Sequence, residues 1–81
     1  MKEIAFSEVK VGETITLKKD PFAIYTRLPD THKGNARFQP INHKGEQRGV
    51  WARFCSRWHC LLLETPEEVA AAIAAKAKQY D

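Results

Sequence analysis

The sequence lacks the features that would place it in or across a membrane. No apolar run approaches the roughly 18 residues that a spanning helix needs. The first residues, MKEIAFSEVKVGE, are broken by acids, so we expect no secretory signal. The chain has only two cysteines, which is too few for a disulfide framework. We therefore expect a cytoplasmic protein with reduced thiols and no membrane partner.

The sequence also lacks the common catalytic motifs. The sequence has no glycine-rich phosphate loop, no Gly-x-Ser-x-Gly elbow and no pair of acids in an apolar setting. Cys55 and His59 would lie about 13 Å apart on a strand, which is too far for a hydrogen bond. Only a helix would bring them one turn apart. We expect no catalytic residues, no cofactor and no enzymatic activity.

Residue types that bind zinc are present, but their arrangement is poor. Cys55, His59 and Cys60, together with His32 or His43, would supply four ligands. On a strand, however, adjacent side chains point to opposite sides, so His59 and Cys60 would not converge. We expect Cys60 to be a small core residue, and we predict no metal site.

The sequence does contain a basic middle third. Residues 31–60 carry six lysines and arginines against Glu46 alone, for a net charge of +5. Residues 1–30 are neutral overall, and residues 61–81 carry −2. A clustered positive field attracts polyanions or acidic protein surfaces.

Alternation of polar and apolar residues predicts several short strands. The predicted strands are 14–17, 22–28 and 36–41. Turn-forming residues fill the intervals 29–35 and 42–49, which we expect to be loops. Pro40 indicates that its strand lies at an edge of the sheet or ends there.

The stretch GVWARFCSRWHCLLLE, residues 49–64, fits both a strand and a helix pattern. We favour two short strands, 50–54 and 58–63, joined by a turn at 55–57. On this interpretation, the side chains that point inward are Phe54, Trp58, Cys60 and Leu62. Those that point outward are Arg53, Arg57 and His59. A buried Trp58 predicts that Trp58→Ala costs about 3–5 kcal/mol.

The C-terminal segment, 65–81, has the strongest helix signals. Thr65 suits the N-cap, Pro66 the first helical position, and Glu68 the third position of a capping box. An alanine-rich run follows, with a narrow apolar stripe of Val69, Ile73, Ala77 and Tyr80. We expect this helix to pack on the sheet or on a partner.

Together these elements predict one domain of a mainly β (α+β) class. Five short strands in residues 1–64 would close into a small barrel, because closure removes exposed sheet edges. The helix of residues 65–81 follows it.

Three short motifs fall within residues 6–63: Phe6, then Val11-Gly12-Glu13 before a strand, and Asn35-Ala36 opening a later strand. The pattern resembles the small SH3-like barrels of phage and mobile-element proteins. The resemblance implies a five-stranded SH3-like barrel that docks on a host protein and modulates or inhibits it. The C-terminal helix lies outside it.

Basic residues alternate with aromatic ones in the middle of the chain, which indicates a binding face. The predicted partner-binding residues are Tyr25, Arg27, Arg37, Arg48, Trp51, Arg53, Arg57 and His59. We favour a host protein with an acidic surface, because arginine and tryptophan are typical of interface hot spots.

Two alternatives to a protein partner stay open. Single-stranded DNA or RNA would use the same residues, with cations along the phosphates and rings stacked on bases. The aromatic residues would otherwise only build a thin core, with the arginines in solvent. A homodimer through an exposed edge at 36–41 or through the helix is also compatible with the sequence.

Overall fold

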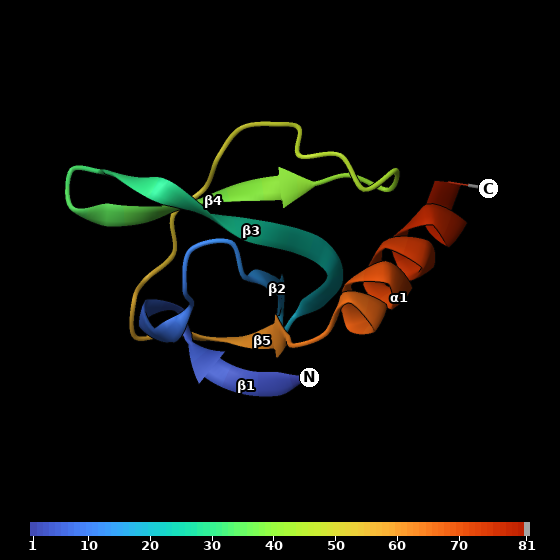
Figure 1. Cartoon of the computed structure of the whole chain (residues 1–81), viewed down its shortest axis with the longest axis horizontal. Coiled ribbons are helices and arrows are strands. Elements are labelled where there is room, and N and C mark those ends of the chain that lie inside the picture. The colour runs from blue at the N-terminus through green and yellow to red at the C-terminus, as the bar shows by residue number, and fades with distance from the viewer. Residues whose placement is uncertain (81) are drawn as a thin grey trace.

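The computed structural model describes residues 1–80 and consists of one antiparallel sheet with a helix at one end (Figure 1). The elements in chain order are β1 (Lys2–Ala5), the short 3-10 helix η1 (Phe6–Glu8), β2 (Thr14–Leu17), β3 (Asp20–His32), β4 (Asn35–Ile41), β5 (His59–Leu63), α1 (Pro66–Ala77) and the 3-10 turn η2 (Lys78–Tyr80). The prediction of a mainly β domain with one C-terminal helix is confirmed.

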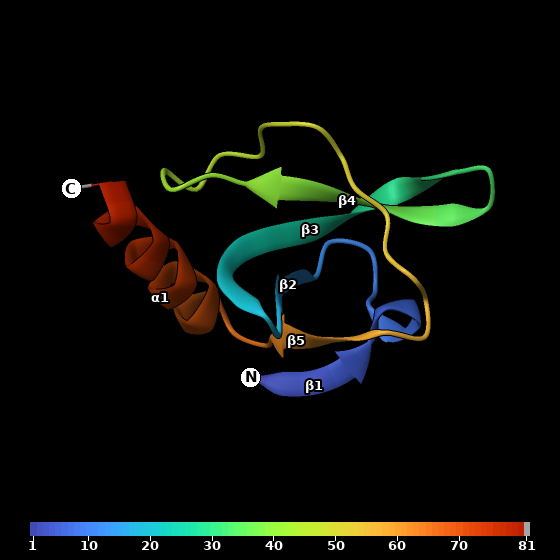
Figure 2. The same cartoon turned by 180° about the vertical axis from the view of Figure 1, so that it is seen from behind.

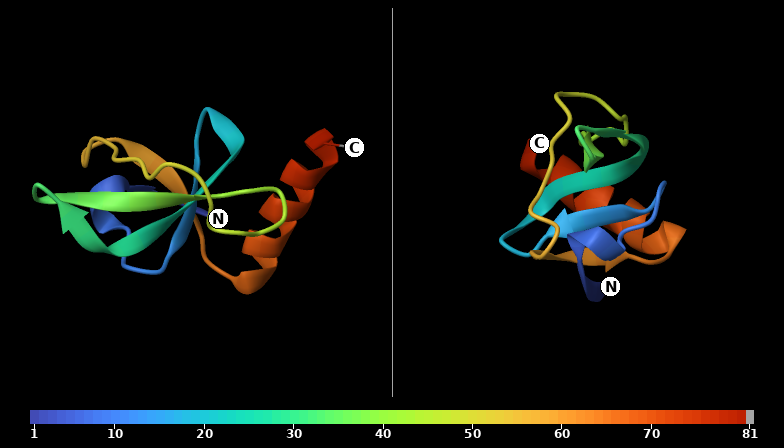
Figure 3. Two further views of the ribbon diagram at one scale, coloured as in Figure 1. Left: turned by 90° about the horizontal axis from the view of Figure 1, so that it is seen from above. Right: turned by 90° about the vertical axis from the view of Figure 1, so that its left-hand side faces the viewer.

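The strand order in the sheet is β1-β5-β2-β3-β4, and all neighbours are antiparallel. The two edge strands, β1 and β4, do not pair with each other in the described part of the chain. The sheet curves strongly, as the two views in Figure 3 show, but its strand order leaves it open. The predicted closed barrel is therefore not confirmed.

The hairpin of β3 and β4 is longer than the sequence predicts. The loop expected at 29–35 is mostly strand, and only Lys33 and Gly34 form the turn. Both have positive φ angles, 52° and 79°, as the central residues of a type I′ hairpin turn do. Pro29 is accommodated because the pairing register shifts around it. The hairpin extends away from α1 (Figure 1).

The interpretation of residues 50–63 is correct in its second half and wrong in its first. Residues 59–63 form β5, but β5 pairs with β1 and β2 rather than with residues 50–54. Residues 50–54 are not a strand, and only Ala52 makes an isolated bridge, to Phe38. A turn is present where it was expected, with the Trp58 N–H donating to the Cys55 carbonyl at 3.0 Å.

The larger hydrophobic cluster lies on the inner face of the curved sheet, and we call it the aromatic core. Its buried members are Ile4, Phe6, Val9, Ile15, Phe38 and Cys60. Pairing of β2 with β3 and β5 places Ile15 beside Tyr25 and Leu62, which also pack on this cluster. The alternation that predicts β2 thus assigns its inner face correctly.

The outer face of the sheet is covered in part by α1, as Figure 2 shows from behind. Val69, Ala72 and Ile73 pack on the second cluster of buried residues, which comprises Ile24, Ile41 and Leu63. No residue of α1 is itself fully buried. No helix within residues 1–80 is long and apolar enough to cross a membrane.

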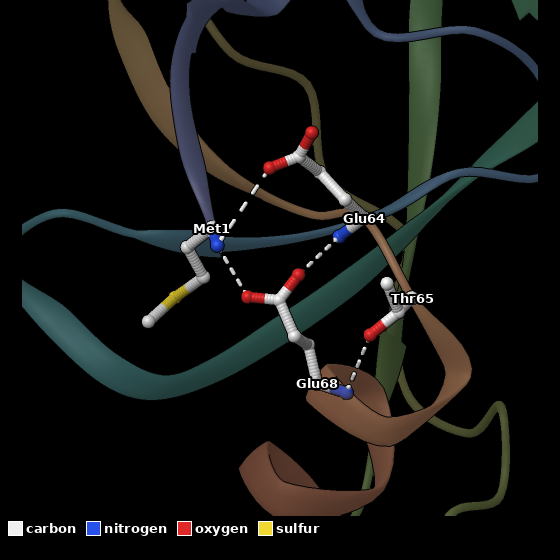
Figure 4. A network of polar contacts seen from close by, with 4 residues as sticks. All are labelled: Met1, Glu64, Thr65 and Glu68. Atoms are coloured by element: carbon white, nitrogen blue, oxygen red, sulfur yellow. Dashed lines mark hydrogen bonds and ion pairs between the residues drawn. The ribbon is translucent and has the colours of Figure 1, made fainter.

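The start of α1 is fixed by the predicted cap and by an ion pair. The Thr65 hydroxyl accepts a hydrogen bond from the Glu68 N–H at 3.1 Å. The Met1 ammonium donates to the Glu68 carboxylate and lies 3.7 Å from a Glu64 carboxylate oxygen (Figure 4). That ammonium is the first cause of the lowered pKa of Glu68. These contacts join the beginning of β1 to the beginning of the helix.

The outer edge of β4, expected to be exposed and available for dimerisation, is partly covered. Ile41 pairs with Gln47, and Phe38 pairs with Ala52 through two backbone hydrogen bonds of 2.8 and 2.9 Å. The residues after β4 turn back along its edge, so less unpaired backbone is left for a second copy.

Candidate functional site

Residues 50–58, which we call the bridging segment, run from edge strand β4 to η1, the short helix that follows the other edge strand, β1. At one end Ala52 pairs with Phe38 on β4. At the other end the Phe6 N–H donates to the Trp58 carbonyl at 2.9 Å, and the Ser7 N–H donates to the Ser56 carbonyl at 3.2 Å. In Figure 1 this part of the chain descends from beside β4 to the level of η1 and β5. It therefore spans the opening that strand pairing leaves.

Phe54, in the middle of the bridging segment, anchors it to the aromatic core. Its ring is stacked on Phe6, with centroids 4.5 Å apart and planes at 15°. It meets Tyr25 and Phe38 edge-on at 5.1 and 5.5 Å. Such aromatic pairs stabilise a core beyond the area that they bury. The inward direction predicted for Phe54 is confirmed.

Trp58 does not point inward, and this is the main correction to the sequence-based interpretation. Its side chain is 66% exposed. The strand 58–63 was expected to keep Trp58 on the face of Cys60, but β5 begins at His59, and Trp58 belongs to the turn before it. Face alternation does not hold outside a strand, so the predicted burial fails at this residue.

The exposed Trp58 borders a pocket of about 420 Å³, which we call the aromatic pocket. Its lining residues are Phe6, Leu17, Lys18, Lys19, Phe54, Trp58 and His59. Apolar side chains thus form most of the surface, and three basic side chains surround it. The pocket lies between η1, the end of β2 and the end of the bridging segment.

A polar network holds one side of the aromatic pocket. The Glu3 carboxylate contacts the His59 Nδ1 at 2.8 Å and the Lys18 ammonium at 3.2 Å. These hydrogen bonds, the one with His59 first, lower the pKa of Glu3. Lys19 makes no ion pair within residues 1–80. The pocket therefore has one lysine that is paired with an acid and one that forms no ion pair in the described part of the chain.

Two of the predicted binding residues, Arg53 and Arg57, are exposed on the bridging segment, as expected. Arg57 also faces the Cys55 thiol. Its backbone N–H and then its guanidinium lower the pKa of that thiol. The third residue expected to lie outward, His59, is exposed at the pocket and paired with Glu3.

Arg37, Trp51 and Arg48 lie elsewhere on the molecule. The Arg37 guanidinium carbon is 4.8 Å from the centre of the Trp51 ring, and Arg37 forms an ion pair with Asp30. Arg48 is well exposed, with a Glu46 carboxylate 4.0 Å away. None of these three lines the aromatic pocket.

Tyr25 and Arg27, the other two predicted binding residues, point to the inner side of the sheet. Both lie on the inner side of β3, where Tyr25 packs on Phe54. The Arg27 guanidinium donates to the Val9 carbonyl at 2.6 Å and is half-buried. The eight predicted residues are thus not gathered in one place, and their contact with a partner stays a prediction.

Sequence reasoning missed Leu17, Lys18, Lys19 and Trp58 as site residues. Lys18 and Lys19 form the turn between β2 and β3. The available signal was the adjacent pair of lysines directly after an apolar strand residue. That signal does not reveal that residues 54–59 come to lie beside this turn.

The cysteines and histidines are dispersed. Within residues 1–80, no group of three or more His, Cys, Asp or Glu side chains is arranged to hold a metal ion. Burial raises the pKa of Cys60 to about 11, so this thiol stays protonated at neutral pH. His59 hydrogen-bonds Glu3 rather than a thiol.

No protein-family model matches the sequence, and neither a curated protein nor a solved structure matches it. The expected origin in a phage or mobile element therefore stays a prediction.

Proposed function

We propose that the protein is a non-enzymatic binding module, and that its aromatic pocket holds an acidic segment of a partner protein. The observation that carries the proposal is the exposed Trp58 at an apolar pocket bordered by basic side chains. Large apolar side chains that stay in water next to a concave apolar surface are typical of binding sites.

The chemistry of the pocket favours a ligand with two features. Phe6, Leu17 and Phe54 offer an apolar floor that suits one aromatic or aliphatic side chain of the partner. Lys18 and Lys19 suit carboxylates that flank this side chain. Arg57, exposed on the neighbouring turn, extends the positive surface. An acidic peptide with one apolar anchor combines these features.

Single-stranded nucleic acid is the second candidate, and the same exposed indole supports it. A base could stack on Trp58 while Lys18, Lys19 and Arg57 contact the phosphates. The floor of the pocket favours the protein ligand, because a shallow stacking surface would not need Leu17 and Phe54 below it.

Fluorescence anisotropy with three labelled probes tests the proposal. The probes are a peptide with one phenylalanine flanked by glutamates, the same peptide with alanine at that position, and a single-stranded oligothymidine. We expect the phenylalanine peptide to bind about tenfold tighter than the alanine peptide, with modest salt dependence. Trp58→Ala should remove this preference, and the matched control Trp51→Phe should keep it.

Two outcomes would contradict the proposal. Tight oligothymidine binding with a steep loss of affinity in salt, and no peptide binding, would assign the pocket to nucleic acid. Equal affinity of the two peptides would show that the apolar floor is not used.

A further inference from the structure

Another pocket also borders Phe6 and Phe54. It has a volume of about 270 Å³ and shares only these two rings with the aromatic pocket. Its lining residues are Phe6, Ser7, Arg27, Thr31, Gly34, Asn35, Ala36, Phe54 and Ser56. We call it the polar pocket. Its walls come from η1, the β3–β4 hairpin and the bridging segment.

The polar pocket collects hydrogen-bond donors and one positive charge. Ser7, Thr31 and Ser56 each carry a hydroxyl, and Asn35 carries a side-chain amide. Arg27 supplies the charge, and no Asp or Glu is among the lining residues. This composition differs from that of the aromatic pocket, whose surface is mostly apolar.

The guanidinium of Arg27 is incompletely satisfied by the protein. One of its donors reaches the Val9 carbonyl at 2.6 Å. Its Nε–H is buried and has no hydrogen-bond partner within residues 1–80. Arg27 also forms no ion pair within residues 1–80, so an anion in this pocket would balance its positive charge. Guanidinium groups bind phosphate and carboxylate oxygens strongly.

We propose that the polar pocket binds a phosphate group. The hydroxyl donors come from three different elements: Ser7 from η1, Thr31 from β3 and Ser56 from the bridging segment. Donors placed around a ligand suit the tetrahedral oxygens of phosphate, whereas a planar carboxylate would be held by the arginine fork alone. The proposal does not depend on what occupies the aromatic pocket.

Thermal melts in sodium phosphate, against sodium chloride of equal ionic strength, provide the first test. We expect a saturable rise in Tm, roughly 5–10 °C at about ten times the dissociation constant, for a domain of this size. O-phosphoserine and sodium acetate, as further probes, separate a phosphate monoester and a carboxylate from free phosphate. If Tm rises as much in sodium chloride or in sodium acetate as in sodium phosphate, the proposal is wrong.

Variants locate the site. Ser7→Ala combined with Ser56→Ala leaves the Arg27–Val9 contact intact, and we expect about tenfold weaker phosphate binding from the lost hydrogen bonds to a charged ligand. Arg27→Gln should abolish binding, and Arg53→Gln, an exposed arginine outside both pockets, is the matched control. If Arg27→Gln does not fold, phosphate binding by the double serine variant is the deciding measurement. Full phosphate binding by the serine pair would place the ion elsewhere.

Backbone amides give an independent readout. Gly34 and Asn35 border the polar pocket, whereas Lys18 and Lys19 border the aromatic pocket. Phosphate should shift the amide resonances of the first pair in NMR spectra and leave those of the second pair in place. The reverse pattern would show phosphate binding to the lysines and would reject the polar pocket.

Discussion

The two faces of the sheet are packed in different ways. On the inner face, aromatic rings from η1, β4 and the bridging segment interlock, and Phe38 is only 1% exposed. On the outer face, an alanine-rich helix packs three partly buried apolar side chains on the second cluster and contributes no fully buried one. Large rings bury more apolar area per residue than alanine does, so the inner face holds most of the stabilising contacts.

This difference implies that the two faces are not equally stable. Opening of the inner face would expose the aromatic core, but detachment of α1 would expose only Ile24, Ile41 and Leu63 with their helix partners. Regions with few buried apolar contacts open at lower free energy. We therefore expect the helix side to open before the sheet unfolds.

The largest expected effect comes from the inner face. Phe38→Ala should lower the free energy of unfolding by about 3–5 kcal/mol, because it removes a buried ring and leaves a cavity. Urea denaturation followed by circular dichroism measures the loss. Phe22→Ala, at a ring that is 36% exposed on β3, is the matched control and should cost far less. Equal losses would mean that the inner face is not the more tightly packed one.

An intermediate effect is expected at the helix side when the pH falls. The pKa of Glu68 is below its ordinary value of 4.5, first because of the Met1 ammonium. The unfolded chain therefore takes up this proton before the folded protein does, and stability that is full above pH 4.5 is lost as the pH falls toward the lowered pKa.

Urea midpoints at about pH 7, 5 and 3 measure this linkage. The midpoint of the wild-type protein should fall between the last two values, and Glu68→Gln should reduce the fall. Glu67→Gln, at the neighbouring position in the first turn of α1, is the control and should behave like wild type. If Glu68→Gln leaves the whole fall unchanged, the Met1–Glu68 contact does not stabilise the helix side.

The smallest effect on stability is expected at Trp58. Its side chain is 66% exposed, so Trp58→Ala should change the free energy of unfolding by no more than about 0.5 kcal/mol. This reverses the loss of about 3–5 kcal/mol that a buried Trp58 predicts. Thermal melts measure the difference, and strong acrylamide quenching of Trp58 in a Trp51→Phe background would verify its exposure. A large loss of stability would indicate that Trp58 is buried in the core.

The parts of the fold that depend on local signals are predictable from the sequence. The cap at Thr65 and Glu68 correctly predicts where α1 begins, because both partners lie within one turn. Alternation in residues 14–17 correctly predicts β2 and its buried Ile15. In both cases the signal lies within a few consecutive residues, although β2 itself also pairs with β5, which is distant in the sequence.

The candidate site depends on distant contacts, and this is why much of it was missed. The bridging segment carries aromatic residues whose pattern fits both a strand and a helix, and from the sequence we favour a strand. In the structure it is neither, because its hydrogen bonds go to Phe6, Ser7 and Phe38. No local pattern shows that Trp58 follows this path to the side of Lys18. The short strand β1 escaped prediction for the same reason, since within residues 1–80 it pairs with the distant β5 alone.

The two cysteines have one consequence for how the protein can be observed. Cys60 is fully buried and has a pKa of about 11, whereas Cys55 lies in the bridging segment with its pKa lowered by Arg57. A thiol-specific reagent therefore meets Cys55 in the folded protein, but it reaches Cys60 only in molecules whose sheet has opened. The rate at which Cys60 is labelled therefore reports how often the sheet opens, and no cysteine has to be introduced for the measurement.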